Sequence, residues 1–346
     1  MNASAPPPGR RARKASGRVT LDDVARLAGV SPITVSRALR QERGVDPALA
    51  ARVQAAAGQL GYVPDPAARA LASQRSTQVL VLVPMLSNAL FVDLLEAVHR
   101  TLFPAGFLPL IGVTHYDVAE EELLLRTYLP HRPAGLLVTG FDRSEAARQL
   151  IARSGVPCVH LMETSDAQGV HCVGFSQTEA GAAMVRHLLE QGRRRIAFCA
   201  AQLDPRTMQR AEGYRQALRQ VGLYDPRLEI LSPERSSIAL GARLFEEVLQ
   251  RLPYADAIFF CNDDIAQGGL LAATRLGVAV PGRMAVAGFN DLAGSDQMVP
   301  PLTTVRTPRG EVGRAGAGML LDLMRGTPPA RHCVALEYEL VVRQST

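Results

Sequence analysis

The stretch from Val19 to Leu39 constrains the fold of this chain more than any other. It reads V-T-L-D-D-V-A-R-L-A-G-V-S-P-I-T-V-S-R-A-L. Thr20 is a suitable cap for a first helix with apolar residues on one face, and Gly29 ends it. Ser31 caps a second helix that has Pro32 at its first position, where a missing N–H costs nothing. The spacing therefore predicts two short helices joined by a tight turn that contains glycine.

This pattern is typical of a helix-turn-helix unit, whose second helix enters the major groove of DNA. An ordinary helical hairpin is the alternative. Candidate DNA contacts are the caps and the outward side chains: Thr20, Ser31, Pro32, Ile33, Thr34, Ser36 and Arg37. Pro32 and Ile33 offer only apolar contact, for example with a thymine methyl group, so polar readout falls to the other side chains. Arg37 is suited equally to a base edge and to a phosphate.

The run D-V-A-R-L-A-G-V-S-P-I-T-V-S-R-A-L (23 to 39) resembles the headpiece of the LacI family of bacterial transcription regulators. The segment G-Y-V-P-D-P-A-A-R-A-L-A (61 to 72) resembles that family's third-helix exit and hinge. The resemblance implies that Leu71 wedges with its dimer mate into a minor-groove step and kinks the DNA, with Arg69 also on the DNA. A plain helical leucine is the alternative for Leu71.

The charge of the chain is unevenly placed. Residues 1–76 hold twelve Lys and Arg against five Asp and Glu, whereas the remaining residues hold 26 against 28. The basic end is therefore expected to meet a polyanion, which agrees with double-stranded operator DNA as a partner. Residues 1–18 are rich in Pro, Arg and Ala without periodicity, which favours a disordered basic arm.

Several protein classes are not expected. The five cysteines show no C-x-x-C spacing and lie in or beside apolar runs, which indicates reduced core residues rather than metal ligands. The sequence has no membrane-length apolar run and no signal peptide, so we expect a cytoplasmic protein without a membrane partner. Nucleophile-elbow, P-loop and zincin motifs are absent from the sequence. No catalytic residue and no cofactor is therefore predicted.

The rest of the chain alternates apolar strands and amphipathic helices, which predicts an α/β fold with two doubly wound lobes behind the all-α headpiece. The resemblance implies lobes of periplasmic-binding-protein type, with the chain crossing back between them. The predicted boundaries are a basic arm at 1–18, a headpiece at 19–65 with a third helix near 47–60, a hinge helix and linker at 66–76, and an effector-binding and dimerisation domain at 77–346. Within that domain the N-lobe comprises about 77–176 and 308–329, and the C-lobe about 177–307 and 330–346. The last strand carries no heptad repeat, so a homodimer is expected.

Ligands of doubly wound folds sit beyond the carboxyl ends of the strands. Candidate effector contacts follow the predicted strands: Ser87, Asn88, Phe91, His115, Tyr116, Glu163, Phe175, Arg206, Arg210, Asn262, Asp263, Asn290 and Asp291. Arg210 matches the family's ligand-binding arginine, with a solvated surface arginine as the alternative. Asn262 and Asp263 could merely cap a helix.

Short motifs resemble the gluconate-responsive subgroup of the family, among them L-M-E (161 to 163) and L-D-P-R-T (203 to 207). Arg206 and Arg210 lie one helical turn apart, so both would lie on one face of a helix. Two cations placed in this way suit a ligand carboxylate. We therefore expect a repressor released from its operator by a linear sugar acid such as gluconate or 2-ketogluconate. A neutral sugar, a co-repressor, a free sugar-binding module and a sugar-acid enzyme are the alternatives.

Overall fold

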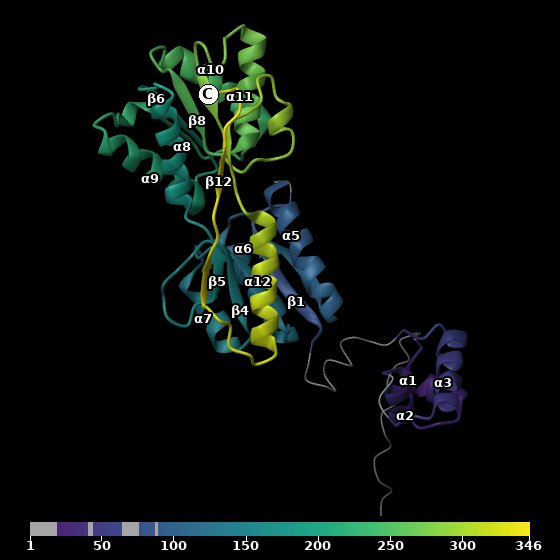
Figure 1. Ribbon diagram of the computed structural model, residues 1–346. Coiled ribbons are helices and arrows are strands. Elements are labelled where there is room, and N and C mark those ends of the chain that lie inside the picture. Colours follow the sequence, from purple (N-terminus) through teal and green to yellow (C-terminus); the bar gives the residue numbers. More distant parts are fainter. Residues whose placement is uncertain (1–18, 41–43, 64–75, 87–88) are drawn as a thin grey trace, which may run out of the picture. The chain divides into compact units, whose positions relative to one another are not determined.

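The computed structural model describes residues 19–40, 44–63, 76–86 and 89–346 (Figure 1). These residues belong to two compact units, Met1–Arg75 and Ser76–Thr346. The predicted basic arm and hinge helix lie outside the described residues. So do four predicted site residues, Arg69, Leu71, Ser87 and Asn88.

The first unit contains α1 (Leu21–Ala28), α2 (Pro32–Leu39) and α3 (Pro47–Leu60). The Ser31 hydroxyl accepts the backbone N–H of Thr34, so Ser31 caps α2 as predicted. Gly29 ends α1 in the left-handed conformation, at a φ of 64° that costs glycine little.

A small apolar core holds the three helices together. Val24, Val35 and Val53 come from α1, α2 and α3, and each is completely buried. The side chains that face away from this core on α2 are thereby left for contact with another molecule.

The second unit begins with a six-stranded sheet and the helices that cover it, here called the N-lobe. Its elements are β1 (Gln78–Val83), α5 (Ala89–Leu102), η1 (Phe103–Ala105), β2 (Leu108–Val113), α6 (Val118–Tyr128), η2 (Leu129–His131), β3 (Gly135–Thr139), α7 (Glu145–Ser154), β4 (Cys158–Met162), β5 (Cys172–Gly174), α12 (Arg309–Met324) and β11 (Cys333–Ala335). The strand order is β11-β5-β4-β3-β1-β2, and all of these strands are parallel.

The central strands β1 and β3 are buried on both faces, as a continuous apolar strand predicts. Val79, Val81 and Val83 of β1 pack into the core that includes α5 and α12. Leu80 and Leu82 point the other way, into a second core formed with α6 and α7. In Figure 1, α5 and α12 lie side by side over one face of the sheet.

The C-lobe holds a four-stranded parallel sheet in the order β7-β6-β8-β9 and an antiparallel pair, β10 with β12. Its elements are α8 (Gln177–Glu190), β6 (Ile196–Ala201), α9 (Pro205–Gln220), η3 (Pro226–Leu228), β7 (Glu229–Ser232), α10 (Ile238–Arg251), β8 (Ala257–Phe260), α11 (Asp263–Leu276), β9 (Ala285–Ala287), η4 (Ser295–Gln297), β10 (Thr304–Arg306) and β12 (Glu339–Val341).

The chain passes between the lobes after β5, after β10 and after β11. The return of α12 to the N-lobe agrees with the expected crossing at about 308–329. The expected C-lobe segment 330–346 is wrong at its start, because β11 pairs in parallel with β5 of the N-lobe. A three-residue edge strand is too short for its hydrophobic pattern to indicate which strand it pairs with.

Two helix pairs of the C-lobe touch through glycines. A Cβ atom on Gly213 of α9 would lie 2.0 Å from the backbone oxygen of Thr178 on α8, and one on Gly181 would lie 2.7 Å from that of Arg210. Gly241 of α10 and Gly268 of α11 meet the partner backbone in the same way. The glycines let α8 and α9 approach closely, which fixes the position of Arg210.

Gly213→Ala is expected to destabilise the protein by about 1–3 kcal/mol, because the added methyl group must displace the backbone of α8. The matched control is Gly318→Ala on α12, where a Cβ would meet nothing within 4 Å. That change should be neutral or stabilising by up to about 1 kcal/mol. Urea unfolding of the three proteins measures both effects, and equal stability of Gly213→Ala and wild type would contradict the packing argument.

Candidate functional site

Loops at the carboxyl ends of strands from both lobes line a hollow whose empty volume, which includes space open to solvent, is about 330 Å³. Its lining residues are Leu90, Phe91, Tyr116, Met162, Asp204, Arg206, Arg210, Asn262 and Asn290. Six of these nine were predicted from the sequence: Phe91, Tyr116, Arg206, Arg210, Asn262 and Asn290. The strand ends thus bring together residues from positions 91 to 290, as the position of ligands in such folds leads one to expect.

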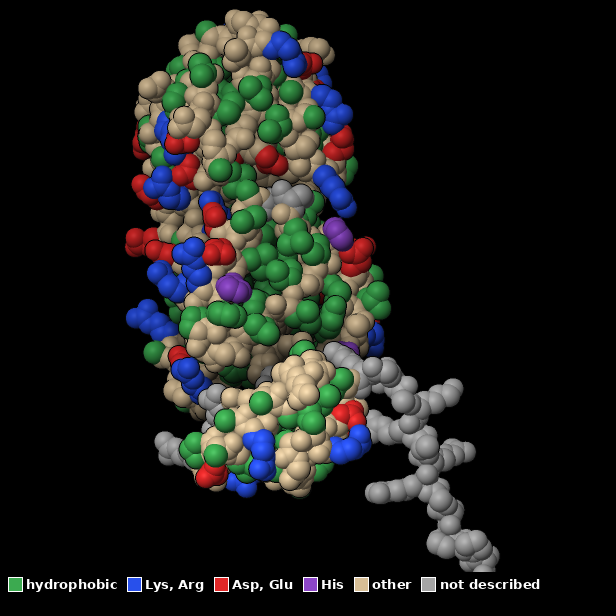
Figure 2. Space-filling model, turned by 90° about the vertical axis from the view of Figure 1, so that its right-hand side faces the viewer, with side chains coloured by type: hydrophobic (Ala, Val, Ile, Leu, Met, Phe, Trp, Pro, Cys, Tyr) green, Lys and Arg blue, Asp and Glu red, His purple; other side chains and the backbone are tan. Residues whose placement is uncertain are grey.

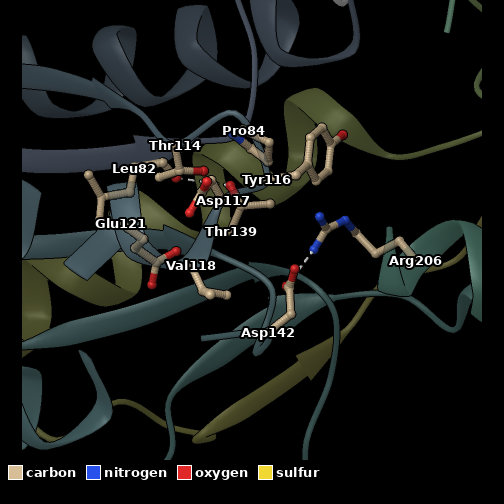
Figure 3. Close-up of a pocket in the computed structure, with 10 residues that line it drawn as sticks. All are labelled: Leu82, Pro84, Thr114, Tyr116, Asp117, Val118, Glu121, Thr139, Asp142 and Arg206. Carbon is tan, nitrogen blue, oxygen red and sulfur yellow. Dashed lines mark hydrogen bonds and ion pairs between the residues drawn. The ribbon is translucent and has the colours of Figure 1, made fainter. Parts of the chain in front are cut away.

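Arg206 is buried among carboxylates. Its Nη1 atom lies 3.0 Å from Oε1 of Glu163 and 3.1 Å from Oδ1 of Asp142, and its Nε atom lies 3.4 Å from Oδ1 of Asp204. Figure 3 shows the guanidinium of Arg206 turned towards Asp142, near the ring of Tyr116. Three carboxylates around one cation leave this end of the hollow with an excess of negative charge.

Arg210 is equally buried but has a different set of partners. Its Nε donates to Oε1 of Gln177 at 2.8 Å, and its Nη1 donates to the carbonyl of Cys261 at 2.8 Å and to Oδ1 of Asn262 at 2.7 Å. Its guanidinium also lies over the ring of Phe289. Among the described residues, Arg210 forms no ion pair with a carboxylate. Burial therefore lowers the pKa of Arg210 below its ordinary value.

Two asparagines complete this end of the hollow. Nδ2 of Asn290 donates to Oδ1 of Asn262, at 3.2 Å. Oδ1 of Asn290 is buried and has no hydrogen-bond partner in the structure. A buried acceptor without a partner is costly, and a ligand hydroxyl or amide would satisfy it.

The backbone is unusual around the hollow. Residues other than glycine with a positive φ include His115, Tyr116, Met162, Gln202, Leu203, Asn290 and Asp291, all of them at or shortly after the ends of strands. Side chains rarely adopt this conformation, and such positions are concentrated at functional sites. The strain therefore marks the same set of loops as the hollow does.

A second hollow of about 300 Å³ adjoins the first and shares Tyr116 and Arg206 with it (Figure 3). Its other lining residues come from the N-lobe: Leu82, Pro84, Thr114, Asp117, Val118, Glu121, Thr139 and Asp142. Hydroxyl and carboxylate groups predominate among its polar side chains. Such groups accept and donate hydrogen bonds to a polyol.

Five predicted effector residues do not line the first hollow. His115 is exposed and pairs with Glu120 at 2.7 Å, whereas Phe175 is a core residue that is 1% exposed. Glu163 is 7% exposed and reaches the site through Arg206. The remaining two hold the C-lobe together and are described next.

Asp263 and Asp291 have structural partners. Asp263 is completely buried and accepts hydrogen bonds from the Thr304 and Ser295 hydroxyls and from the backbone N–H of Leu292. Burial raises the pKa of Asp263 to about 6. Asp291 pairs with Arg306 and Arg343, each at 2.8 Å. Both carboxylates tie the segment after β9 to its neighbours.

Three lining residues were missed. Asp204 and Met162 lie inside the motifs L-D-P-R-T and L-M-E, and Leu90 precedes Phe91. Asp204 caps α9 by accepting the N–H groups of Arg206 and Thr207, so its sequence signal is that of an N-cap. The same carboxylate lies beside Arg206, which a capping pattern alone does not reveal.

A buried polar cluster lies in the N-lobe beside the second hollow. Arg143 pairs with Glu121 at 2.7 Å and lies 3.1 Å from Nδ1 of His160, whose ring stacks on Phe141. Burial, together with the positive charge of Arg143, lowers the pKa of His160 to about 4. His160 is therefore neutral in the folded protein at neutral pH.

Between about pH 6.5 and pH 4 the unfolded chain binds a proton at His160 that the folded protein does not. His160 should therefore contribute a loss of about 1–3 kcal/mol of unfolding free energy as the pH drops through this window, whereas the raised pKa of Asp263 contributes a gain. His160→Gln is expected to remove the loss and so to make the protein less sensitive to acid than wild type, and the surface variant His131→Gln to keep the wild-type slope. Urea unfolding at a series of pH values measures the slopes, and an unchanged slope in His160→Gln would refute the assignment.

The second candidate site is the outer face of α2. Ile33 is 73% exposed, and Pro32 and Arg37 are exposed as well. The Thr34 hydroxyl is bonded to the Ser31 hydroxyl at 2.8 Å. Thr20 donates its backbone N–H and its hydroxyl to Asp23 in the first turn of α1. The capped helix α2 therefore exposes the side chains of an isoleucine and an arginine.

Two kinds of feature are absent from the described ranges. No cluster of His, Cys, Asp or Glu among them could hold a metal ion. None of the described helices is long and apolar enough to cross a membrane.

Comparison with protein families gives two matches. Residues 20–65 match "Bacterial regulatory proteins, lacI family", and residues 185–346 match "Periplasmic binding protein-like domain". The first range contains α1 to α3, and the second begins within α8 and contains the later elements of the C-lobe together with α12 and β11 of the N-lobe.

Individual proteins are similar over nearly the whole chain. The transcriptional regulator GntR of Pseudomonas aeruginosa is 54% identical over 333 residues, which is 96% of this chain and 97% of that protein. The crystal structure of the regulator GntR from Chromobacterium violaceum is 46% identical, with a TM-score of 0.76, covering 78% of this chain and 98% of that one. The lac repressor dimer bound to operator and an anti-inducer is 26% identical, with a TM-score of 0.82, covering 95% of this chain and 99% of that one.

Proposed function

This chain belongs to the LacI family of bacterial regulatory proteins, and on that premise we propose that it represses genes of gluconate-type sugar-acid metabolism. As a homodimer it binds a pseudo-palindromic operator through α2. A sugar acid that binds between the lobes releases it. The names of the similar regulators support this assignment, and the contents of the hollow support it independently.

The observation that carries the sugar-acid assignment is the contrast between two arginines one turn apart on α9. Arg206 already has three carboxylate neighbours, whereas the hydrogen-bond partners of Arg210 within the described residues are neutral and the charges of Asp204 and Asp264 act on it only from beyond ion-pair distance. A buried charge is stable only when it is paired and hydrogen-bonded. Arg210 is therefore the anchor for the ligand carboxylate, and the planar guanidinium gives it a two-donor match.

The opposite end of the hollow suits the hydroxyl groups of the same ligand. Asp142 lines the adjoining hollow, is held in place by Arg206 and has acceptor capacity left for a hydroxyl. Asn290 offers its unpartnered Oδ1 near Arg210. A linear molecule with a carboxylate at one end and hydroxyls along its length matches this arrangement.

A neutral sugar is the main rival ligand, because amides and carboxylates also recognise hydroxyls. It would leave the buried Arg210 guanidinium without an anion in contact, which argues against it. A sugar-acid enzyme is the rival activity. Burial raises the pKa of both Asp263 and Asp264 in this region, but Asp263 is occupied by structural hydrogen bonds and neither carboxyl group lines the hollows, so both are poorly placed as an acid or base.

Exposed apolar residues support the homodimer. Figure 2, which views residues 76–346 from the side of α5, shows many hydrophobic side chains at the surface. Val92, Phe103, Leu108 and Ile111 of α5, η1 and β2 are each between 43% and 56% exposed. Large exposed apolar patches mark interaction sites, and a second copy would cover this one.

Arg210→Gln is expected to weaken D-gluconate binding by about a hundredfold or more, because the variant loses the charge that pairs with the carboxylate. The matched control is Arg219→Gln on the same helix, since Arg219 is exposed and pairs with Glu212. Calorimetric titration of the three proteins measures the affinities. Wild-type affinity in Arg210→Gln, or release of operator by a neutral sugar and not by a sugar acid, would refute the anchor.

Arg37→Ala is expected to weaken operator binding by about 1–3 kcal/mol, because one bidentate contact to a base is lost. Arg52→Ala on α3 removes the same charge from another exposed position of the unit and serves as the control. Fluorescence anisotropy at fixed salt, with operator and with unrelated DNA, measures both. If Arg37→Ala loses equal affinity for the two DNAs, Arg37 contacts phosphate and does not read the sequence.

A further inference from the structure

Arg309 opens α12 at the point where the chain returns from the C-lobe to the N-lobe. Its Nε and Nη2 atoms donate to Oδ2 of Asp93 on α5, at 3.1 and 2.7 Å. Its Nη1 donates to the backbone carbonyl of Asn290, and its Nη2 lies 3.4 Å from the carbonyl of Asp291. One guanidinium thus contacts a helix of the N-lobe and the segment after β9 of the C-lobe.

The C-lobe end of this contact leads into the ligand site. Asn290 turns its side chain into the hollow and its carbonyl towards Arg309. Nδ2 of Asn290 bonds to Asn262, and Asn262 accepts a hydrogen bond from Arg210. Direct contacts therefore run from the proposed carboxylate anchor to Arg309, although Arg309 itself does not line the hollow.

The N-lobe end leads to the start of the sheet. Asp93 lies in the first turns of α5, close to Leu90 and Phe91, which line the hollow. This helix follows β1, the first strand of the unit, and packs along α12. A displacement of α5 relative to the segment after β9 would therefore change how the two lobes meet.

We propose that Arg309 is the residue that couples ligand binding at Asn290 to the position of α5, and so to release of the operator. Asn290 and Asp291 have φ values of 112° and 51°, so this segment is held in a sparsely populated conformation. A ligand group that hydrogen-bonds to the free Oδ1 of Asn290 favours one arrangement of this segment. Because Arg309 contacts both the segment and Asp93, a change in the segment changes the position of α5. The inference rests on the function proposed above.

A residue that merely stabilises the fold would behave differently from a coupling residue. Coupling is the factor by which the ligand changes operator affinity, and it can change while both separate affinities stay constant. Position between two sites does not prove coupling, so the test must measure this factor directly.

The experiment measures operator affinity by fluorescence anisotropy, with and without saturating D-gluconate, in the full-length protein. In Arg309→Gln we expect operator affinity without gluconate, and gluconate affinity by calorimetry, to stay within about threefold of wild type. The factor by which gluconate weakens operator binding should fall at least about fivefold. Arg314→Gln, on the exposed side of the same helix, should keep the wild-type factor. A wild-type factor in Arg309→Gln overturns the proposal.

Two further arms keep the outcome clear. If Arg309→Gln does not fold, Asp93→Asn removes the other end of the ion pair at a position that is 56% exposed. A wild-type coupling factor there overturns the proposal. If gluconate does not release wild-type protein, the proposed function fails instead. The coupling contact is then tested by hydrogen exchange without ligand, in which α5 and residues 288–292 should exchange faster in Arg309→Gln than in Arg314→Gln, and equal exchange overturns it.

Discussion

The effector site depends on the buried guanidinium of Arg210, whose hydrogen-bond partners are neutral. Burying a guanidinium without an anion is costly, and the scaffold meets that cost in part through Gln177, Asn262 and a backbone carbonyl. The close contact of α8 and α9 through Gly181 and Gly213 supports this arrangement, because it places Gln177 against Arg210. Packing of the C-lobe thus holds a site that an anion can complete.

Much of the fold follows from local patterns in the sequence. Caps and glycines bound the helices of the first unit, because a cap needs only the residues of its own turn. The long apolar strands were equally clear. The pairing of β11 with β5 was not, because three-residue strands far apart in sequence carry no periodic signal and the topology of the crossing decides their partner.

The site shows the same limit. Spacing predicted that Arg206 and Arg210 share a helix face, and both line the hollow. Their different electrostatic surroundings could not be predicted, because Asp142 and Glu163 lie in loops that follow strands of the N-lobe. Asp263 and Asp291 follow strands as ligand residues do, yet their contacts are structural. Which side of a loop a carboxylate faces is a tertiary property that residue type does not determine.

The carboxylate of the ligand is the group that determines which small molecule the site binds. Calorimetric titration of the wild-type protein with D-gluconate and with its neutral counterpart D-glucitol tests this most directly, because the two differ in charge and little in shape. We predict binding of gluconate at least about a hundredfold tighter, as expected when an anion pairs with a buried guanidinium. Equal affinities, or tighter binding of glucitol, would contradict the claim that Arg210 binds the carboxylate of the ligand.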